Sequence, residues 1–282
     1  MLVRETDAHW HIIAQHEHAR LSGILAEHVG NERFAGLCRD EATIGIALHD
    51  AGWQTIDRDA PPLTPVGKPA DVFECDLAVS MQAWSASSQL AADVHPYAGL
   101  LVSLHGLRLS SDAGTSSPGK PSKLPEGDLR LRFEFNKFQH AQIELQEQLR
   151  PRLGLRTDRP LRLGLSEDSV DLDEAMLASD FAWLRAMDAI SLIACMDRAP
   201  FDTTPPVPLQ PAGGTIRLKT RRRGERLIVG PWPFNTLAIE CTIAMTRIPK
   251  RRFQTPAELA EAIRGGESER QGGGVVGRGG AP

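Results

Sequence analysis

The sequence predicts a mainly α-helical protein with a small antiparallel β region near its C-terminus. Apolar residues recur at helical spacing in most of the first 198 residues. From residue 199 the chain becomes rich in Pro and Gly, and short β-like runs follow. The last stretch, GGESERQGGGVVGRGGAP, is too poor in apolar residues to build a core. We therefore expect a helical domain over 1–198, a β appendage over 199–264 and a disordered tail over 265–282.

The helical domain is expected to contain a series of amphipathic helices. Gly30 supplies a stop for the first of them, Asp40 a candidate N-cap for the second, and Pro96 suits the first turn of the fourth. The Ser/Gly/Pro-rich segment 110–127 predicts a long flexible loop, and 151–170 is expected to be irregular. The predicted helices cover residues 16–29, 40–50, 76–92, 96–107, 128–149 and 171–197.

The appendage is predicted from three β-like runs, at 215–219, 226–230 and 236–245. The basic stretch KTRRRGER between the first two is expected to form a solvated hairpin turn. A short helix over 256–264 follows, opened by Thr255 and Pro256.

Composition excludes several classes of protein. The net charge of −4 argues against a nucleic-acid binder held by bulk charge. No apolar run is long enough for a transmembrane helix, and the N-terminus lacks the apolar core of a signal peptide. Four cysteines stand far apart without a CxxC spacing, which is typical of reduced thiols. We expect a cytoplasmic protein that does not associate with membranes; its oligomeric state is left open.

Candidate chemistry rests on polar residues placed on apolar helix faces. His18 shares a face with Leu21 and Leu25, whereas His16 points elsewhere. His49 and Asp50 end an apolar run, and a carboxylate near a helix C-terminus is disfavoured unless it is paired or bound to metal. Each residue also has a simpler interpretation. His18 could be a hydrogen-bonded core histidine, and the other two a histidine–carboxylate pair.

Asp188 is the one acid in the apolar stripe of its helix, and burying it alone would be costly. It could pair with Arg185 three residues earlier, or it could share a metal. His105 lies on one face with Leu101 and is a further candidate ligand, while His95 precedes Pro96 at a helix start. Imidazole and carboxylate together suit Mn, Fe, Ni, Co, Zn or Mg, with one or two ions per chain.

The ordered set His18, His49, Asp50 and Asp188 resembles the HD-domain superfamily of helical metal-dependent phosphohydrolases. His95 and His105 would resemble the subset with two metals. The chain is also similar to an uncharacterised bacterial family of this type, a domain of unknown function. This similarity is carried by QHEHARLSG, ALHDAGW, TPVGKP, YAGLLVSLHG, AMDAISLIAC and GPWPF. The resemblance implies an HD-like helical bundle.

The resemblance also implies hydrolysis of a small phosphorylated compound or nucleotide, with metal-activated water as the nucleophile. Asp50 would hold metal and orient the nucleophile, and Lys68 in TPVGKP would assist the phosphate. Trp53, Asp57 and His95 are candidates for the substrate pocket, although Trp53 could simply pack in the core. Two alternatives remain open. One is a di-iron oxygenase resembling myo-inositol oxygenase; the other is a non-catalytic binding or regulatory protein with a structural metal.

Overall fold

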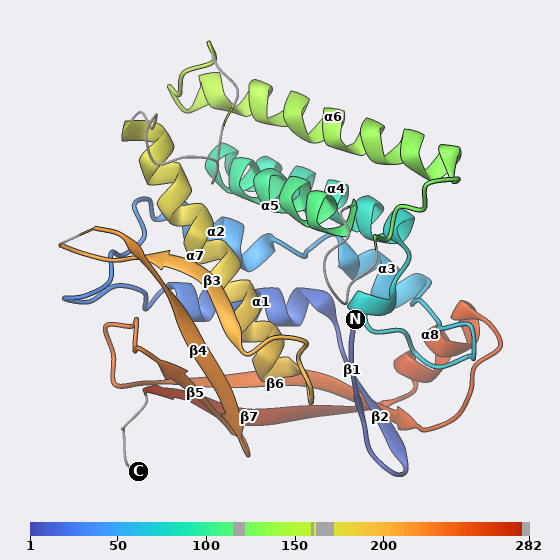
Figure 1. Ribbon diagram of the computed structural model, residues 1–282. Helices are drawn as coiled ribbons and strands as arrows, with labels where there is room; N and C mark the ends of the chain where they lie inside the picture. The colour runs from blue at the N-terminus through green and yellow to red at the C-terminus, as the bar shows by residue number, and fades with distance from the viewer. Residues whose placement is uncertain (115–121, 159–160, 162–171, 212, 278–282) are drawn as a thin grey trace.

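The fold is taken from a computed structural model, which describes residues 1–114, 122–158, 161, 172–211 and 213–277 (Figure 1). The expected loop 110–127 is wrong for residues 110–114, which continue the helix that begins at Pro96, and residues 115–121 lie outside the described part. Residues 151–152 of the expected irregular segment 151–170 are helical, and most of the rest, 159–160 and 162–170, lies outside the described part. Among the described helices, none combines the length and the apolar character needed to cross a membrane.

Every helix expected from periodicity is present. Pro96 opens its helix as predicted, and the Thr255 side chain accepts a hydrogen bond from the amide of Glu258. Asp40 occupies the predicted N-cap position but makes no side-chain capping bond. The helices are α1 Gln15–Ala26, α2 Glu41–Leu48, α4 Leu77–Val94, α5 Pro96–Gly114, α6 Leu129–Arg152, α7 Leu172–Cys195 and α8 Pro256–Arg264. Two short additions are α3 Trp53–Asp59 and the 3-10 turn η1 Val72–Glu74.

The expectation of a mainly α protein with a small β appendage is wrong. A seven-stranded mixed sheet runs along one side of the molecule, in the order β1-β2-β6-β7-β5-β4-β3. All neighbouring strands are antiparallel except β5 and β7. The strands are β1 Leu2–Glu5, β2 His9–Ile13, β3 Thr203–Pro208, β4 Thr215–Arg223, β5 Arg226–Gly230, β6 Ala238–Pro249 and β7 Glu267–Gly277.

Four of these strands, β1, β2, β3 and β7, were not predicted, and there is a physical reason why the sequence did not reveal each of them. The first two come from the N-terminus and pair with β6, an association across most of the chain that periodicity does not reveal. β3 contains three prolines, which a sheet tolerates at its edge, and β3 is an edge strand. β4 and β5 do form the expected hairpin, with Arg223 paired to Arg226 across the turn.

The expectation of a disordered tail is also wrong for residues 267–277, which form β7 between β6 and β5. This strand has few apolar side chains. It is held in place mainly by backbone hydrogen bonds to the strands on both sides. Val275 is its main anchor and is buried in the core. Residues 278–282 lie outside the described part.

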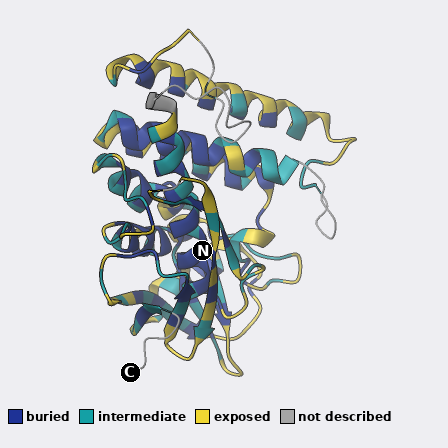
Figure 2. Cartoon of the chain, turned by 60° about the vertical axis from the view of Figure 1, so that its left-hand side comes forward, coloured by how far each residue is buried: buried dark blue, intermediate teal, exposed yellow. Residues whose placement is uncertain are grey.

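Helices and sheet form layers that share one apolar core. α6 is the outermost helix and packs on α4 and α5, while α1, α2 and α7 lie between these helices and the sheet (Figure 1). Burial follows the same order, with the outer face of α6 exposed and the helices beneath it largely buried (Figure 2). Leu101 of α5, Trp183 of α7 and Val229 of β5 belong to one cluster, so the sheet is an integral layer of the protein.

Candidate metal centre

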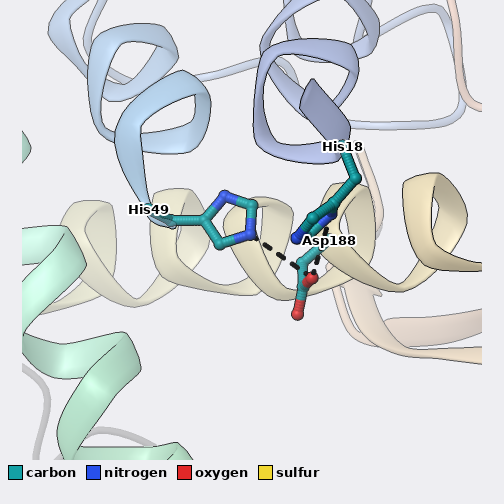
Figure 3. A group of neighbouring side chains, drawn as sticks. All are labelled: His18, His49 and Asp188. Atoms are coloured by element: carbon teal, nitrogen blue, oxygen red, sulfur yellow. Dashed lines mark ion pairs between the residues drawn. The ribbon is translucent and has the colours of Figure 1, made fainter. Parts of the chain in front are cut away.

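Five of the residues singled out in the sequence meet between four helices. His18 projects from the first turn of α1, His49 from the residue directly after α2, and Asp188 from α7 (Figure 3). Asp50 follows His49 directly, and His105 comes from α5. The three histidines are almost completely buried, at 0% for His18, 1% for His49 and 3% for His105. Residues from distant parts of the sequence thus form one enclosed polar cluster.

Asp188 is the hub of this cluster. Its Oδ1 lies 3.4 Å from Nε2 of His49 and 3.9 Å from Nδ1 of His18. Its Oδ2 lies 3.6 Å from Nε2 of His105. The rings of His18 and His105 stand 5.0 and 5.2 Å from that of His49, both edge-on. Asp188 therefore pairs with histidines, and the alternative pairing with Arg185 is not formed.

The protonation of His49 is fixed by its neighbour in α2. Its Nδ1 lies 2.7 Å from the main-chain oxygen of Ile46, which can only accept, so Nδ1 carries the proton. In a neutral ring the lone pair of Nε2 then faces the carboxylate of Asp188. Nε2 has no hydrogen-bond partner although it is buried. Two electron-rich atoms held this close require a proton or a metal cation between them.

His18 lies on the other side of the cluster and has a partner at each ring nitrogen. Its Nδ1 lies 3.0 Å from the hydroxyl of Ser191, which is itself 2.9 Å from the main-chain oxygen of Asp188. Its Nε2 lies 2.9 Å from Oδ2 of Asp50, a carboxylate oxygen that can only accept, so Nε2 carries a proton here. Gln15 donates to the same oxygen at 3.0 Å, leaving Oδ1 of Asp50 without a partner. A metal ion bound by Nε2 of His18 would take the place of the proton that Nε2 now shares with Asp50, while Ser191 holds the ring at Nδ1.

The electrostatics of the cluster place a proton where a cation would bind. Burial opposes charge on His49, but the close approach of Asp188 and the charge of Asp50 raise its pKa to about 9. Burial lowers the pKa of His105 to about 4, so its ring is neutral at pH 7. Burial also acts to raise the pKa of both aspartates, yet contact with the histidines holds each below its usual value. Two carboxylates thus remain ionised in a buried site.

This donor set fits a divalent cation. Among the described residues, His18, His49 and Asp188 each offer one ligand atom, and these atoms lie within 4.8 Å of one another. Asp50 and His105 adjoin them, and three buried cluster atoms lack hydrogen bonds: His49 Nε2, Asp50 Oδ1 and His105 Nδ1. Imidazole nitrogens mixed with carboxylate oxygens suit Mn, Fe, Ni, Co or Zn better than an all-oxygen site would.

The remaining predicted site residues lie elsewhere. Lys68 is exposed, and its ammonium lies 5.8 Å from the ring centre of Trp10 rather than at the cluster. Asp57 pairs with the N-terminal ammonium of Met1 at 2.7 Å and accepts from the amide of Gln15. The structure therefore gives Lys68 and Asp57 no direct contact with the five clustered residues.

The other two pocket candidates have structural contacts. Trp53 is fully buried against Cys75 and Ala83, which matches the core-packing interpretation. His95 is partly exposed, accepts from the amide of Tyr97 at 3.2 Å, and lies 3.9 Å from Glu41. The sequence interpretation did not include Ser191 and Gln15, which orient His18 and Asp50. Each is a polar residue three positions from a candidate ligand, and that spacing could have pointed to them.

Comparison with known proteins gives one family. The family model described as "Protein of unknown function (DUF3891)" matches residues 1–250. The chain belongs to the DUF3891 family. No curated protein and no solved structure matches the chain. The region shared with the family contains the complete cluster and ends after β6, before α8 and β7.

Proposed function

We propose that this DUF3891 protein is an HD-type, metal-dependent phosphohydrolase that acts on a small phosphorylated compound or nucleotide. One observation carries the proposal. His49 and His18 each commit one ring nitrogen to a main-chain or hydroxyl oxygen and turn the other toward a buried carboxylate. A proton can bridge one imidazole nitrogen and one carboxylate. A divalent cation would bind both carboxylates and both imidazoles together.

The residues of the cluster divide the work. His18, His49, His105, Asp50 and Asp188 would hold the ion or ions. A bound divalent ion supplies charge neutralisation at a phosphoryl group and lowers the pKa of water. Asp50 is oriented through Oδ2 by Gln15 and His18, so its unpartnered Oδ1 is free to accept a proton from the attacking water. The water oxygen bonds to phosphorus as the bond to the leaving oxygen breaks.

Lys68 has no catalytic role in this mechanism, because it lies over Trp10. Hydrolysis is favoured over the oxygenase alternative. That alternative needs two extra histidines, and one of them, His95, contacts Tyr97 instead of the cluster. The proposal also places the protein in the cytoplasm, in keeping with four cysteines that are all free.

The test begins with the metal content of the purified full chain, measured by elemental analysis. We expect Mn, Fe, Ni, Co, Zn or Mg, and release of phosphate from p-nitrophenyl phosphate or a nucleotide panel that stops after chelation. His49→Ala and Asp188→Ala should lose the metal, because each removes a central ligand. His16→Ala is the matched control, since His16 is partly exposed and contacts Glu17 instead of the cluster.

Three results would contradict the proposal. Metal retained by Asp188→Ala would overturn the ligand set. Two irons per chain with an O₂-dependent spectral change would favour the oxygenase. A metal whose removal unfolds the protein, without turnover of any phosphorylated compound, would favour the non-catalytic role.

A further inference from the structure

One face of α7 carries the most exposed residue of the cluster. Asp188 is its least buried member, with 15% of its side chain exposed. In the middle of α7 the partly exposed positions are Ala182, Arg185 and Asp188, and the residues between them are buried. These positions follow one another at intervals of three, so they line the same side of the helix. This partly exposed face of α7 therefore brings small and charged side chains up to the cluster.

Two arginines lie near this face of α7. Arg185 lies one turn before Asp188 on α7, and Arg108 lies one turn after His105 on α5. The contact of His105 with Asp188 brings the two helices together at this level. The charge of Arg108 also acts on Arg185, so the two arginines lie near each other beside this contact between the helices. Their mutual repulsion is felt at Arg185, whose pKa is lowered by burial and by the charge of Arg108.

Arg185 forms no close ion pair in the part of the chain that the structure describes. No carboxylate there lies within 4 Å of its guanidinium, and Asp188 is paired with histidines instead. Its guanidinium lies 5.9 Å from the centre of the Phe181 ring. Asp112 and Asp188 act on it from farther away and raise its pKa, but burial, Arg108 and Arg217 of β4 outweigh them and the pKa is lowered. Burying a cation that is not fully compensated costs folding free energy, and an anion would relieve that cost.

We propose that Arg185 and Arg108 form the phosphate-binding site at the entrance to the metal centre, and that the ligand is a terminal phosphate group. This inference rests on the proposed function, since it names the part of the substrate that the same site receives. A guanidinium suits the task because its planar donors grip two phosphate oxygens at once. Arg108 is held by Asp112 through Nε at 3.1 Å in an exposed pair, which is weak and leaves its other donors available.

Binding of inorganic phosphate tests the site without turnover. Calorimetry at low ionic strength on chelator-treated full-length protein removes any contribution from metal. We expect Arg185→Ala to weaken phosphate binding at least tenfold, Arg185→Lys to weaken it less, and Arg108→Ala to weaken it several-fold. Arg130→Ala is the matched control, because Arg130 is an exposed arginine of α6. Arg108 is exposed as well, so its variant keeps the test valid if Arg185→Ala fails to fold.

The results separate this inference from the proposed function. Phosphate bound equally well by Arg185→Ala and by wild type, or no phosphate binding by wild type, would overturn the arginine site. Arg185-dependent phosphate binding supports it, even in a protein that proves to hold no metal and to release no phosphate, in which case only the hydrolase falls. If phosphate release persists in Arg185→Ala with an unchanged KM, the hydrolase stands and the arginine site falls.

Discussion

Ser191 is the residue that fixes how His18 faces its carboxylate. Its hydroxyl lies 3.0 Å from Nδ1 of His18 and accepts from Ser22 at 2.8 Å. We expect Ser191→Ala to weaken metal binding roughly 10- to 100-fold, the usual cost of losing a group that orients a metal-bound histidine. Metal titration monitored by calorimetry would measure this.

The control for that variant is Ser85→Ala, because Ser85 is an exposed serine of α4. It should bind metal as wild type does. If Ser191→Ala also binds metal with wild-type affinity, Ser191 does not orient His18.

Asp57 is predicted to matter for stability rather than for catalysis. It neutralises the buried ammonium of Met1 and accepts from the amide of Gln15 at 2.8 Å. We expect Asp57→Asn to lower the free energy of unfolding by about 3 kcal/mol, because it leaves a buried charge unpaired. Chemical denaturation measures the change, and metal content should stay at the wild-type level.

Asp59→Asn is the matched control for Asp57. Asp59 also forms an ion pair, with Arg58, but both side chains are exposed. The expected change is about 0–1 kcal/mol. Equal effects of the two variants would contradict the structural role given to Asp57.

At the scale of elements, the turn after α2 depends on a glycine. A Cβ on Gly52 would lie 2.1 Å from the main-chain oxygen of Ala83 and 2.5 Å from the amide of Ser87. The amide of Gly52 also donates to the hydroxyl of Ser87 at 2.9 Å. The turn carrying Asp50 is therefore pressed directly against the backbone of α4.

We predict that Gly52→Ala destabilises the protein by about 3 kcal/mol or more, because the clash is with main-chain atoms of α4 and neither this helix nor the turn can move without losing packing. Thermal unfolding measures the loss, and metal affinity should fall with it because Asp50 moves. Gly272→Ala is the control, because a Cβ there meets nothing within 4 Å. A Gly52→Ala protein with unchanged melting temperature would show that the helices can move apart.

The helices and most of the clustered histidines and aspartates could be predicted because their signals are local. His18, His49 and Asp188 each interrupt an apolar helix face, and that pattern is visible within one element. Lys68 was misplaced for the opposite reason. Its loop turns toward Trp10 of β2, a strand that joins the sheet only through pairing with distant β6. The alternative in which Arg185 pairs with Asp188 is not formed, because histidines from three other parts of the helical layer lie against that carboxylate.

The sheet shows the same limit at the scale of the whole molecule. β7 has three consecutive glycines, so its sequence is typical of a flexible tail. It forms a strand nonetheless, because the neighbouring strands on both sides supply its hydrogen bonds and its own strand propensity matters little. Its antiparallel register with β6 runs from Ala238 opposite Val276 to Arg247 opposite Glu267. A parallel register with β5 follows on the other side. β7 is thus the strand that joins the two halves of the sheet.

Two arginines tie this sheet to the helix that carries Asp188. Arg4 of β1 donates to the main-chain oxygens of Ala194 and Cys195 at the end of α7, and also to Gln271 of β7. Arg222 of β4 donates to the oxygen of Met196 at 3.0 Å. Cations at a helix C-terminus donate to its free carbonyl groups and interact favourably with the negative end of its dipole. Strands from both halves of the sheet therefore hold α7, so the sheet is connected through this helix to the cluster around Asp188.

Removal of β7 should consequently unfold more than the tail. We predict that a chain ending at residue 266 loses cooperative unfolding or aggregates, because β6 and β5 become open edges and Arg4 loses Gln271. A chain ending at residue 277 keeps the strand and should melt as the full chain does. Circular dichroism melts and light scattering would compare them. A 1–266 protein with full-length stability and metal content would mean that β7 is dispensable and that residues 1–250, the family's own span, fold without it.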